Sequence, residues 1–344
     1  MKSIFKFALA YVVLVPLIYC VLCVVTHQRI FPPWRNAQGG DVKVSEYVES
    51  IKEIFSDIFS EPQVPPPPPP PVHDGEHGSV SPLPAGLPTI EVSSTAELLA
   101  ALGPDRIVVL NRGSYLFEGL YENSPSKYYA WGEEENEAHS LVIKGVKNLR
   151  IESRTKWDTT VLTRHERGWT LVFEDCQNVE LDGLVLGHTS KGFCTGGVVL
   201  IKKGCSNFRV TNSILFGCGT IGLRAEDSRD IKFADSIIRG CTYGIAQLER
   251  SAEVNFKRCD FIHNECFTGI EVKECKDITI QSSFFGGNRD AGNTENSQFS
   301  LIEGDAATIG FLVENCQFSK GQTSNHLVGK IDETGNTQVD EVKP

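Results

Sequence analysis

The 344-residue sequence lacks several features that would assign it to a common class of protein. It has no excess of positive charge, because 33 lysines and arginines face 44 acidic residues and the formal net charge is −11. Phosphate binding needs a basic surface, so nucleic acid is not an expected partner. The sequence has 11 cysteines, but its Cys-x-x-Cys pair, Cys20 and Cys23, lies inside an apolar run, and no cysteine–histidine cluster has zinc spacing. We therefore expect no structural metal and no cofactor.

Charge is also missing from residues 7–25, a nineteen-residue apolar stretch near the start of the chain. As a helix it would be about 28 Å long, close to the roughly 30 Å hydrocarbon core of a bilayer. The stretch is long for the apolar part of a signal peptide and no Ala-x-Ala pattern follows it, so an uncleaved anchor is favoured over cleavage. Lys2 and Lys6 favour a cytoplasmic N-terminus over residues 1–6. We expect a single-pass membrane protein whose body is exported to the periplasmic or cell-surface side.

Residues 41–60 have apolar side chains at the 3.6-residue spacing of an amphipathic helix, and the opposite face is acidic. An acidic face does not suit anionic lipid. It leaves self-association, docking on a protein partner or packing on the folded body, and a helix that is only partly formed is the alternative.

Residues 61–88 are rich in proline and include an unbroken run of seven prolines, Pro65–Pro71. Such a run adopts polyproline II and would reach about 22 Å. We predict a stiff spacer, with a ligand for a proline-recognition domain as the alternative. The body should begin near Thr89, with a short helix whose first turn carries the capping box Ser94 to Glu97 and a strand over residues 106–110.

Five segments of the body align without gaps and form an internal repeat. Their equivalent apolar residues stand 29, 23, 23 and 24 residues apart: Val179, Phe208, Ile231, Val254 and Ile278. Apolar residues two apart, with Asn, Asp or Gly at bends, are typical of short strands. A coil in which each turn covers the next accounts for the period. Leucine-rich repeats are the alternative, but the leucine spacing is absent.

The repeat also predicts which side chains point into the coil. One inward file holds Leu181, Val210, Phe233, Phe256 and Ile280, and a second holds Leu186, Leu215, Ile238, Phe261 and Phe285. Further turns are centred on Leu149 and Phe311. These rungs resemble the right-handed parallel β-helix of the pectin lyase-like superfamily, over roughly residues 89–320. The resemblance implies an all-β, single-stranded solenoid with a capping helix at its start, and a polar tail is expected over 321–344.

Most of the cysteines fall into files as well. One file holds Cys176, Cys205, Ser228, Ser251 and Cys275, and another holds Cys218, Cys241, Asn264 and Asn288. Neighbouring turns are about 4.8 Å apart, so a disulfide within a file is sterically possible in an exported protein. Small buried thiols are the favoured interpretation.

Three long interruptions of the repeat are candidate functional loops. Residues 118–140 hold Tyr121, Tyr128, Tyr129 and Trp131, which can stack on sugar rings. Residues 156–169 hold Arg164, His165, Glu166 and Arg167, which can neutralise a uronate and move a proton. Residues 188–197 hold His188 and Lys191. Loops that leave one side would wall a cleft near the first turns, although His188 alone is more often a turn residue than a base.

One strand face carries charged and polar side chains in register on three successive turns: Arg224, Glu226, Gln247, Glu249, Glu271 and Lys273. This lattice can hold the hydroxyl groups of an extended sugar chain. It is also compatible with a solvated ladder of ion pairs that keeps the sheet soluble. This second interpretation is the favoured one.

The resemblance implies carbohydrate as the first substrate class, because many pectin lyase-like enzymes are polysaccharide lyases, hydrolases or epimerases. Fold alone does not settle function. Of the polygalacturonase-type signatures only Gly187-His188-Thr189 is present in part, and no calcium-binding group of acids is recognisable. We therefore predict non-catalytic binding of a glycan or another envelope component. The alternative is a polysaccharide lyase or epimerase that acts on a uronate-containing polymer through Arg164, His165, Glu166 and His188.

Overall fold

A computed structural model describes residues 83–121, 125–132, 138–189, 196–217, 221–291, 299–320 and 327–340. The predicted anchor (7–25), the amphipathic segment (41–60) and the spacer up to residue 82 lie outside these residues. Among the residues that are described, no helix has the length and apolar character needed to cross a membrane.

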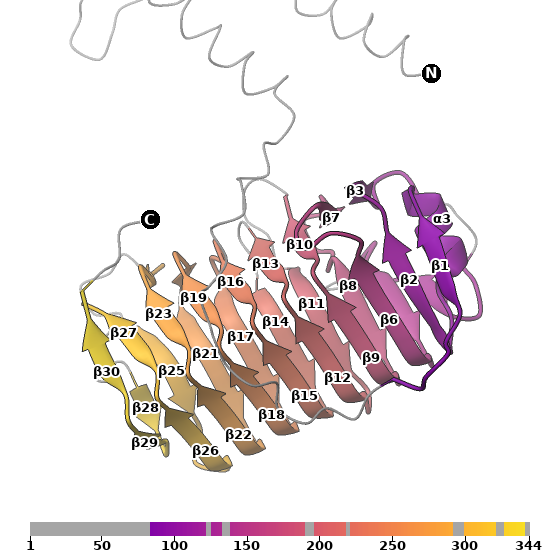
Figure 1. The fold of residues 1–344 in the computed structure, drawn as a ribbon. Coiled ribbons are helices and arrows are strands. Elements are labelled where there is room, and N and C mark those ends of the chain that lie inside the picture. Colours follow the sequence, from indigo (N-terminus) through magenta and orange to yellow (C-terminus); the bar gives the residue numbers. More distant parts are fainter. Residues whose placement is uncertain are drawn as a thin grey trace, which may run out of the picture. The chain divides into compact units, whose positions relative to one another are not determined.

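The described body is a coil built from three sheets, and each turn adds one strand to each of them (Figure 1). Sheet I holds, in spatial order, β1 (Thr89–Val92), β2 (Arg106–Leu110), β6 (Lys147–Ser153), β9 (Gln177–Asp182), β12 (Ser206–Thr211), β15 (Arg229–Ala234), β18 (Ala252–Lys257), β22 (Lys276–Gln281), β26 (Ile309–Glu314) and β29 (Asp332–Thr334). Sheet II holds β3 (Gly113–Leu116), β7 (Thr159–Thr163), β10 (Val185–His188), β13 (Ile214–Gly217), β16 (Ile237–Arg239), β19 (Asp260–Ile262), β23 (Phe284–Gly286), β27 (Gln317–Ser319) and β30 (Thr337–Val339).

Sheet III holds β4 (Tyr129–Trp131), β5 (Leu141–Lys144), β8 (Leu171–Glu174), β11 (Gly197–Lys202), β14 (Ile221–Glu226), β17 (Gly244–Glu249), β21 (Thr268–Lys273), β25 (Ser300–Gly304) and β28 (Leu327–Gly329). The pairing within the three sheets is parallel except between β4 and β5, which form an antiparallel pair. A small fourth sheet pairs β20 (Glu265–Cys266) with β24 (Arg289–Asp290). Parallel neighbours that come from successive turns confirm the predicted stacking.

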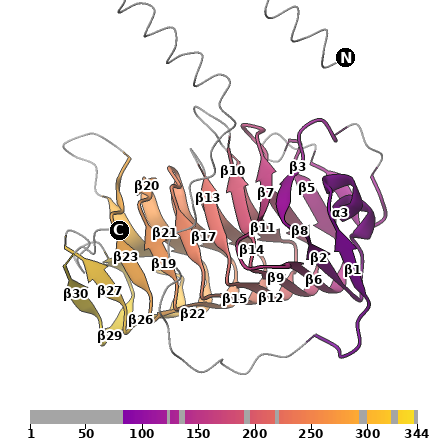
Figure 2. The same ribbon diagram turned by 45° about the horizontal axis from the view of Figure 1, so that its top comes forward.

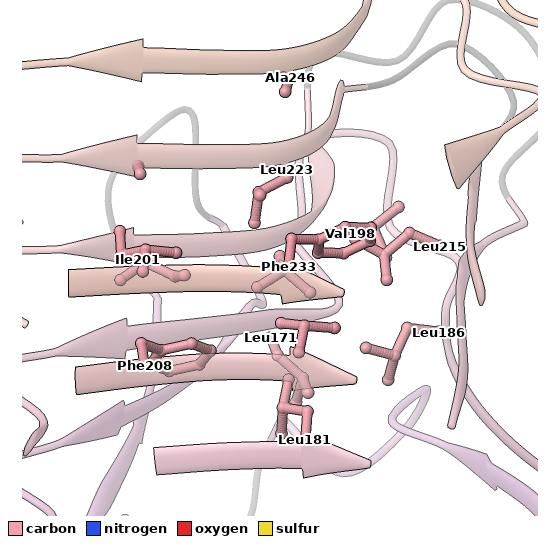
Figure 3. Close-up of a cluster of buried hydrophobic side chains, with 14 of the residues drawn as sticks. Leu171, Leu181, Leu186, Val198, Ile201, Phe208, Leu215, Leu223, Phe233 and Ala246 are labelled. Atoms are coloured by element: carbon pink, nitrogen blue, oxygen red, sulfur yellow. The ribbon is translucent and has the colours of Figure 1, made fainter. Parts of the chain in front are cut away.

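The register confirms the predicted inward files. Phe208 lies beside Ile231, and Ile231 beside Val254, in neighbouring strands of sheet I. The side chains of both predicted files are fully buried, and they meet side chains of sheet III between the sheets (Figure 3). Each file thus forms a column of the core, and every turn depends on its neighbours to exclude water from its apolar residues.

The corners between sheets explain the Asn, Asp and Gly residues of the repeat. From β6 to β26, the second residue of every sheet I strand has positive φ, and Asn207, Asp230 and Asp277 adopt φ of 53°, 49° and 56° there. Asn and Asp tolerate this conformation better than most residues with a side chain. The side-chain amide of Asn207 also donates a hydrogen bond to Oδ1 of Asn178 across 2.8 Å, so hydrogen bonds link the corner residues of successive turns.

The cysteine files lie at these corners, and the described cysteines are free and buried. The backbone N–H of Cys176 donates to Sγ of Cys205 across 3.3 Å, which places these two thiols on adjacent turns. Burial raises the pKa of Cys241 and of Cys259. Thiols of this kind fill space, and they are poor nucleophiles.

The two ends of the coil are closed in different ways (Figures 1 and 2). At the first turn, helix α3 (Thr95–Ala101) begins at the predicted cap, where the backbone N–H of Glu97 donates to Oγ of Ser94 across 3.2 Å. At the other end the coil passes the predicted boundary at residue 320, because β28, β29 and β30 add strands in register. Glu333 and Gln338 occupy inward positions of this last turn and are exposed. Polar residues at these two positions explain why the sequence reads as a tail, because they break the apolar pattern of the repeat.

Candidate functional site

The long loops leave the coil at one corner, between sheet II and sheet III, which we call the II–III corner. Residues 117–128 precede β4, residues 164–170 connect β7 to β8, and residues 189–196 connect β10 to β11. Because β3, β7 and β10 are neighbours in sheet II, these loops begin side by side along one edge (Figure 2). Lys156 and Trp157, from the predicted loop 156–169, lie instead at the turn between sheets I and II.

Four rings meet at this corner, and we call them the ring cluster: Tyr121, Trp131, His139 and His165. The ring centroids of His139 and His165 are 4.3 Å apart, and those of Tyr121 and His139 are 4.5 Å apart. Trp131 lies edge-on to Tyr121, with 5.3 Å between centroids. His139 is exposed and the other three rings are half-buried. The cluster therefore offers ring faces and polar ring atoms to the solvent.

Hydrogen bonds from buried parts of the coil fix the position of His165. His188, at the end of β10, is fully buried, and its Nε2 lies 2.8 Å from the carbonyl oxygen of His165. The backbone N–H of Gly168 donates to the same carbonyl across 3.0 Å, and that of Arg167 donates to Nδ1 of His165 across 3.3 Å. Since its ring is buried, His188 positions the turn and does not itself face the solvent.

A second apolar cluster ties the same turn to the outer face of sheet III. It consists of Val142, Trp169, Val172, Leu200 and Ile221. The backbone N–H of Trp169 donates to Oγ of Ser140 across 2.7 Å. A Cβ on Gly197 would lie 2.2 Å from the Trp169 ring, so only glycine leaves room for the indole. The ring cluster therefore stands on a well-packed base, which is what a preorganised binding surface requires.

Charged groups flank the ring cluster. Arg164 Nη1 lies 3.3 Å from Oε2 of Glu118, and both side chains are exposed. Glu166 and Arg167 are exposed on the same turn. An exposed ion pair is worth little, so Arg164 can exchange Glu118 for another carboxylate at small cost.

Burial sets the protonation states of the cluster. Desolvation and the neighbouring His139 hold the pKa of His165 below its usual range, against the opposing charge of Glu166. Desolvation raises the pKa of the Tyr121 phenol, and a hydrogen bond with Thr163 opposes that rise. At neutral pH the cluster thus presents a neutral His165 imidazole and a protonated phenol beside guanidinium groups. The imidazole and the phenol can form hydrogen bonds with sugar hydroxyl groups, and the guanidinium groups can pair with a carboxylate.

We expect the buried His188 to make stability depend on pH. Desolvation holds its folded-state pKa below the ordinary 6.5, so the unfolded chain binds a proton that the folded chain does not. Stability should be full above about pH 6.5 and fall as pH drops below it, by at most about 1.4 kcal/mol per pH unit for this one proton. In urea titrations between pH 5 and 8, His188→Gln should show a shallower slope. His263→Gln, which removes an exposed histidine, should keep the wild-type slope, and equal slopes in all three proteins would contradict this role of His188.

The charged lattice predicted on sheet III lies on a different face from the ring cluster. Arg224, Gln247 and Glu271 are neighbours across β14, β17 and β21, as are Glu226, Glu249 and Lys273. The charges pair with one another: Arg224 lies 2.5 Å from Glu226 and 3.6 Å from Glu249, and Lys273 lies 2.5 Å from Glu271. Their charges are thus largely engaged within the ladder.

Comparisons with known proteins address the architecture. Residues 172–285 match the family described as "Right handed beta helix region". A pectin methylesterase from Aspergillus niger in deglycosylated form superposes with a TM-score of 0.50 and 11% identity, over 76% of this chain and 88% of that one. The pectate lyase Pel9A superposes with a TM-score of 0.50 and 11% identity, over 74% of this chain and 71% of that one. No curated protein matches the sequence.

The body has the fold of a right-handed parallel β-helix. At these identities the likeness concerns the fold, and functional residues must come from this chain's own site. Within the described part of this β-helix, no group of three or more His, Cys, Asp or Glu side chains is arranged to hold a metal ion.

The other two predicted ring residues are not part of the solvent-facing side of the cluster. Tyr129 is buried in the core, where its ring centroid is 6.2 Å from that of Trp131. Tyr128 lines a pocket of about 500 Å³ beside α3, together with Arg106, Ser126 and Tyr129. Lys191 lies outside the described residues.

Sequence reasoning missed His139 as a member of the site. His139 lies two residues before β5 and His165 six residues before β8, so alignment of the rungs does not pair them. The stacking of successive turns nevertheless places His139 and His165 in contact. The sequence feature that could have indicated this contact is the presence of one histidine in each of two successive corner loops.

Proposed function

We propose that this protein binds an acidic glycan, without catalysis, at the ring cluster. The observation that carries the proposal is the group of rings, of which His139 is exposed and the others half-buried, with Arg164 and Arg167 beside it. Aromatic and imidazole faces stack on the apolar faces of sugar rings. A guanidinium group pairs with a carboxylate through two parallel hydrogen bonds, which a neutral sugar cannot offer.

Uronate polymers are the first ligand class to test. Two proteins of the same fold are, by their names, a pectin methylesterase and a pectate lyase. The arginines on the turn after β7 supply the charge that a uronate needs.

Calorimetric titration of the full-length chain with a galacturonate octamer tests the proposal. Binding should weaken as salt is raised, because part of it is ionic and the site is exposed. A neutral glucan oligomer of equal length serves as the control. Equal affinity for both oligomers would contradict the role of the arginines, and no binding to either would end the proposal.

A second candidate function is a polysaccharide lyase or epimerase on a uronate polymer. The observation that favours it is the contact of His165 with His139 and Tyr121, which places an acceptor and a donor of protons together. Both reactions begin with removal of a proton next to a carboxylate, and a neutral imidazole is a suitable base. Incubation with polygalacturonate should release no unsaturated product if the protein only binds. Release of that product, lost in His165→Ala, would favour the enzyme.

We also propose that residues 7–25 anchor the chain and that Pro65–Pro71 holds the body away from the membrane. The support is the uncharged length of the first segment and the stiffness of the second. Carbonate extraction of membranes should leave the full chain in the pellet, whereas a chain that begins at residue 26 should be released. Release of the full chain would contradict the anchor.

A further inference from the structure

Two exposed aromatic rings extend along the same corner as the ring cluster. Tyr243 is 42% exposed and Phe267 is 52% exposed, which makes them the most exposed aromatic side chains among the described residues. Their centroids are 5.7 Å apart, with an interplanar angle of 70°. Tyr243 belongs to the turn before β17 and Phe267 to the turn before β21, so they lie on adjacent turns of the coil.

The backbone beneath these rings is fixed. The N–H of Phe267 donates to the carbonyl of Tyr243 across 3.3 Å, and the N–H of Glu265 donates to that of Cys241 across 2.8 Å. Cys241 and Cys266 are fully buried next to them. The rings are therefore exposed because the corner turns outward, and not because the segment lacks support. Exposed apolar side chains that gather on a rigid surface mark a contact with a ligand or a partner.

The position of these rings relates them to the ring cluster. Sheet II runs β7, β10, β13, β16, β19, and its strands are about 4.8 Å apart. The turn with Tyr243 thus begins about 14 Å beyond the turn with His165, and the turn with Phe267 about 19 Å beyond it. The two groups of rings stand in line along the II–III corner.

We infer that Tyr243 and Phe267 form a second sugar-stacking platform, so that one uronate chain laid along the II–III corner contacts both groups of rings. This inference rests on the proposed function. A guanidinium group that could serve the same ligand lies beside the platform, because Arg289 is exposed and its Nη2 lies 2.8 Å from Oε2 of Glu265. That exposed pair can open at small cost and give the guanidinium to a uronate carboxylate.

A platform of this kind makes affinity depend on chain length. A disaccharide is too short to reach from the ring cluster to Tyr243, whereas an octasaccharide can occupy both. The second contact is then intramolecular and multiplies the affinity without change at the first site. Loss of two stacking rings should weaken octasaccharide binding about tenfold.

The experiment titrates the full-length chain with a galacturonate disaccharide and an octasaccharide. Tyr243→Ala/Phe267→Ala should bind the octasaccharide about tenfold more weakly and the disaccharide as wild type does. Tyr243→Phe keeps a ring and should retain the affinity. Ile309→Ala removes a 61% exposed apolar side chain from another edge and is the matched control.

The outcomes are distinguishable. If wild type binds the octasaccharide and the double variant binds it equally well, the platform is ruled out and the proposed function stands. If wild type binds neither oligomer, both the platform and the proposed function are ruled out. If instead the double variant abolishes a concentration-dependent self-association seen by sedimentation, the rings serve a contact with a second copy and the inference is overturned.

Discussion

Arg164→Glu/Arg167→Glu is expected to weaken binding of a galacturonate octamer at least about a hundredfold. The change removes both guanidinium groups of the turn after β7 and adds two carboxylates beside Glu118 and Glu166. Attraction of a uronate then becomes repulsion. Calorimetry at low salt measures the effect, since screening reduces interactions between exposed charges.

The control for that prediction reverses two other exposed charges. Arg229 and Lys147 are exposed on sheet I, away from the II–III corner. Their replacement by glutamate changes the net charge by the same amount. Equal loss of affinity in the two double variants would mean that total charge, and not the corner, governs binding.

Phe233→Ala is expected to lower the free energy of unfolding by about 3–5 kcal/mol. The ring is fully buried between turns and lies 5.9 Å, centroid to centroid, from Phe256 on the next turn. Its removal leaves a cavity that neighbouring turns cannot fill without breaking their own register. Urea denaturation of the full chain measures the change.

Phe267→Ala provides the matched control for the loss of a core ring. It removes a side chain that is 52% exposed, so the unfolding free energy should stay within about 0.5 kcal/mol of wild type. A similar cost for both substitutions would contradict the division into inward and outward positions.

The repeat made the fold predictable because geometry forces the same residue types at the same positions. Inward positions such as Phe208 and Ile231 must be apolar on every turn, and corner positions such as Asn207 and Asp230 must tolerate positive φ. These two requirements leave a period in the sequence. The last turn escaped prediction because its inward positions hold Glu333 and Gln338.

The outer apolar patch of sheet III was harder to predict. Val198, Val199, Leu200 and Ile201 are all buried, so the alternation that separates inside from outside disappears in β11. Leu200 packs with Trp169 outside the core, and Ile201 packs within it. A run of four apolar residues is compatible with either side, and the sequence cannot tell which residue faces the core.

The site itself was only partly predictable. Arg164 and His165 stood out because they interrupt the repeat with charge, and Tyr121 and Trp131 because loops rarely need so many rings. The contact of His139 with His165 depends on how two corner loops of unequal length fold against each other. Tyr243 and Phe267 sit in short corner segments that look ordinary in the sequence, and only their exposure distinguishes them.

A crystal structure of the full-length chain with a galacturonate octamer tests the account most directly. We expect a sugar ring against Tyr121 and His139, and a carboxylate within hydrogen-bond distance of Arg164 or Arg167. An oligomer bound on the charged ladder of sheet III, or in the pocket beside α3, would contradict the assignment of the site.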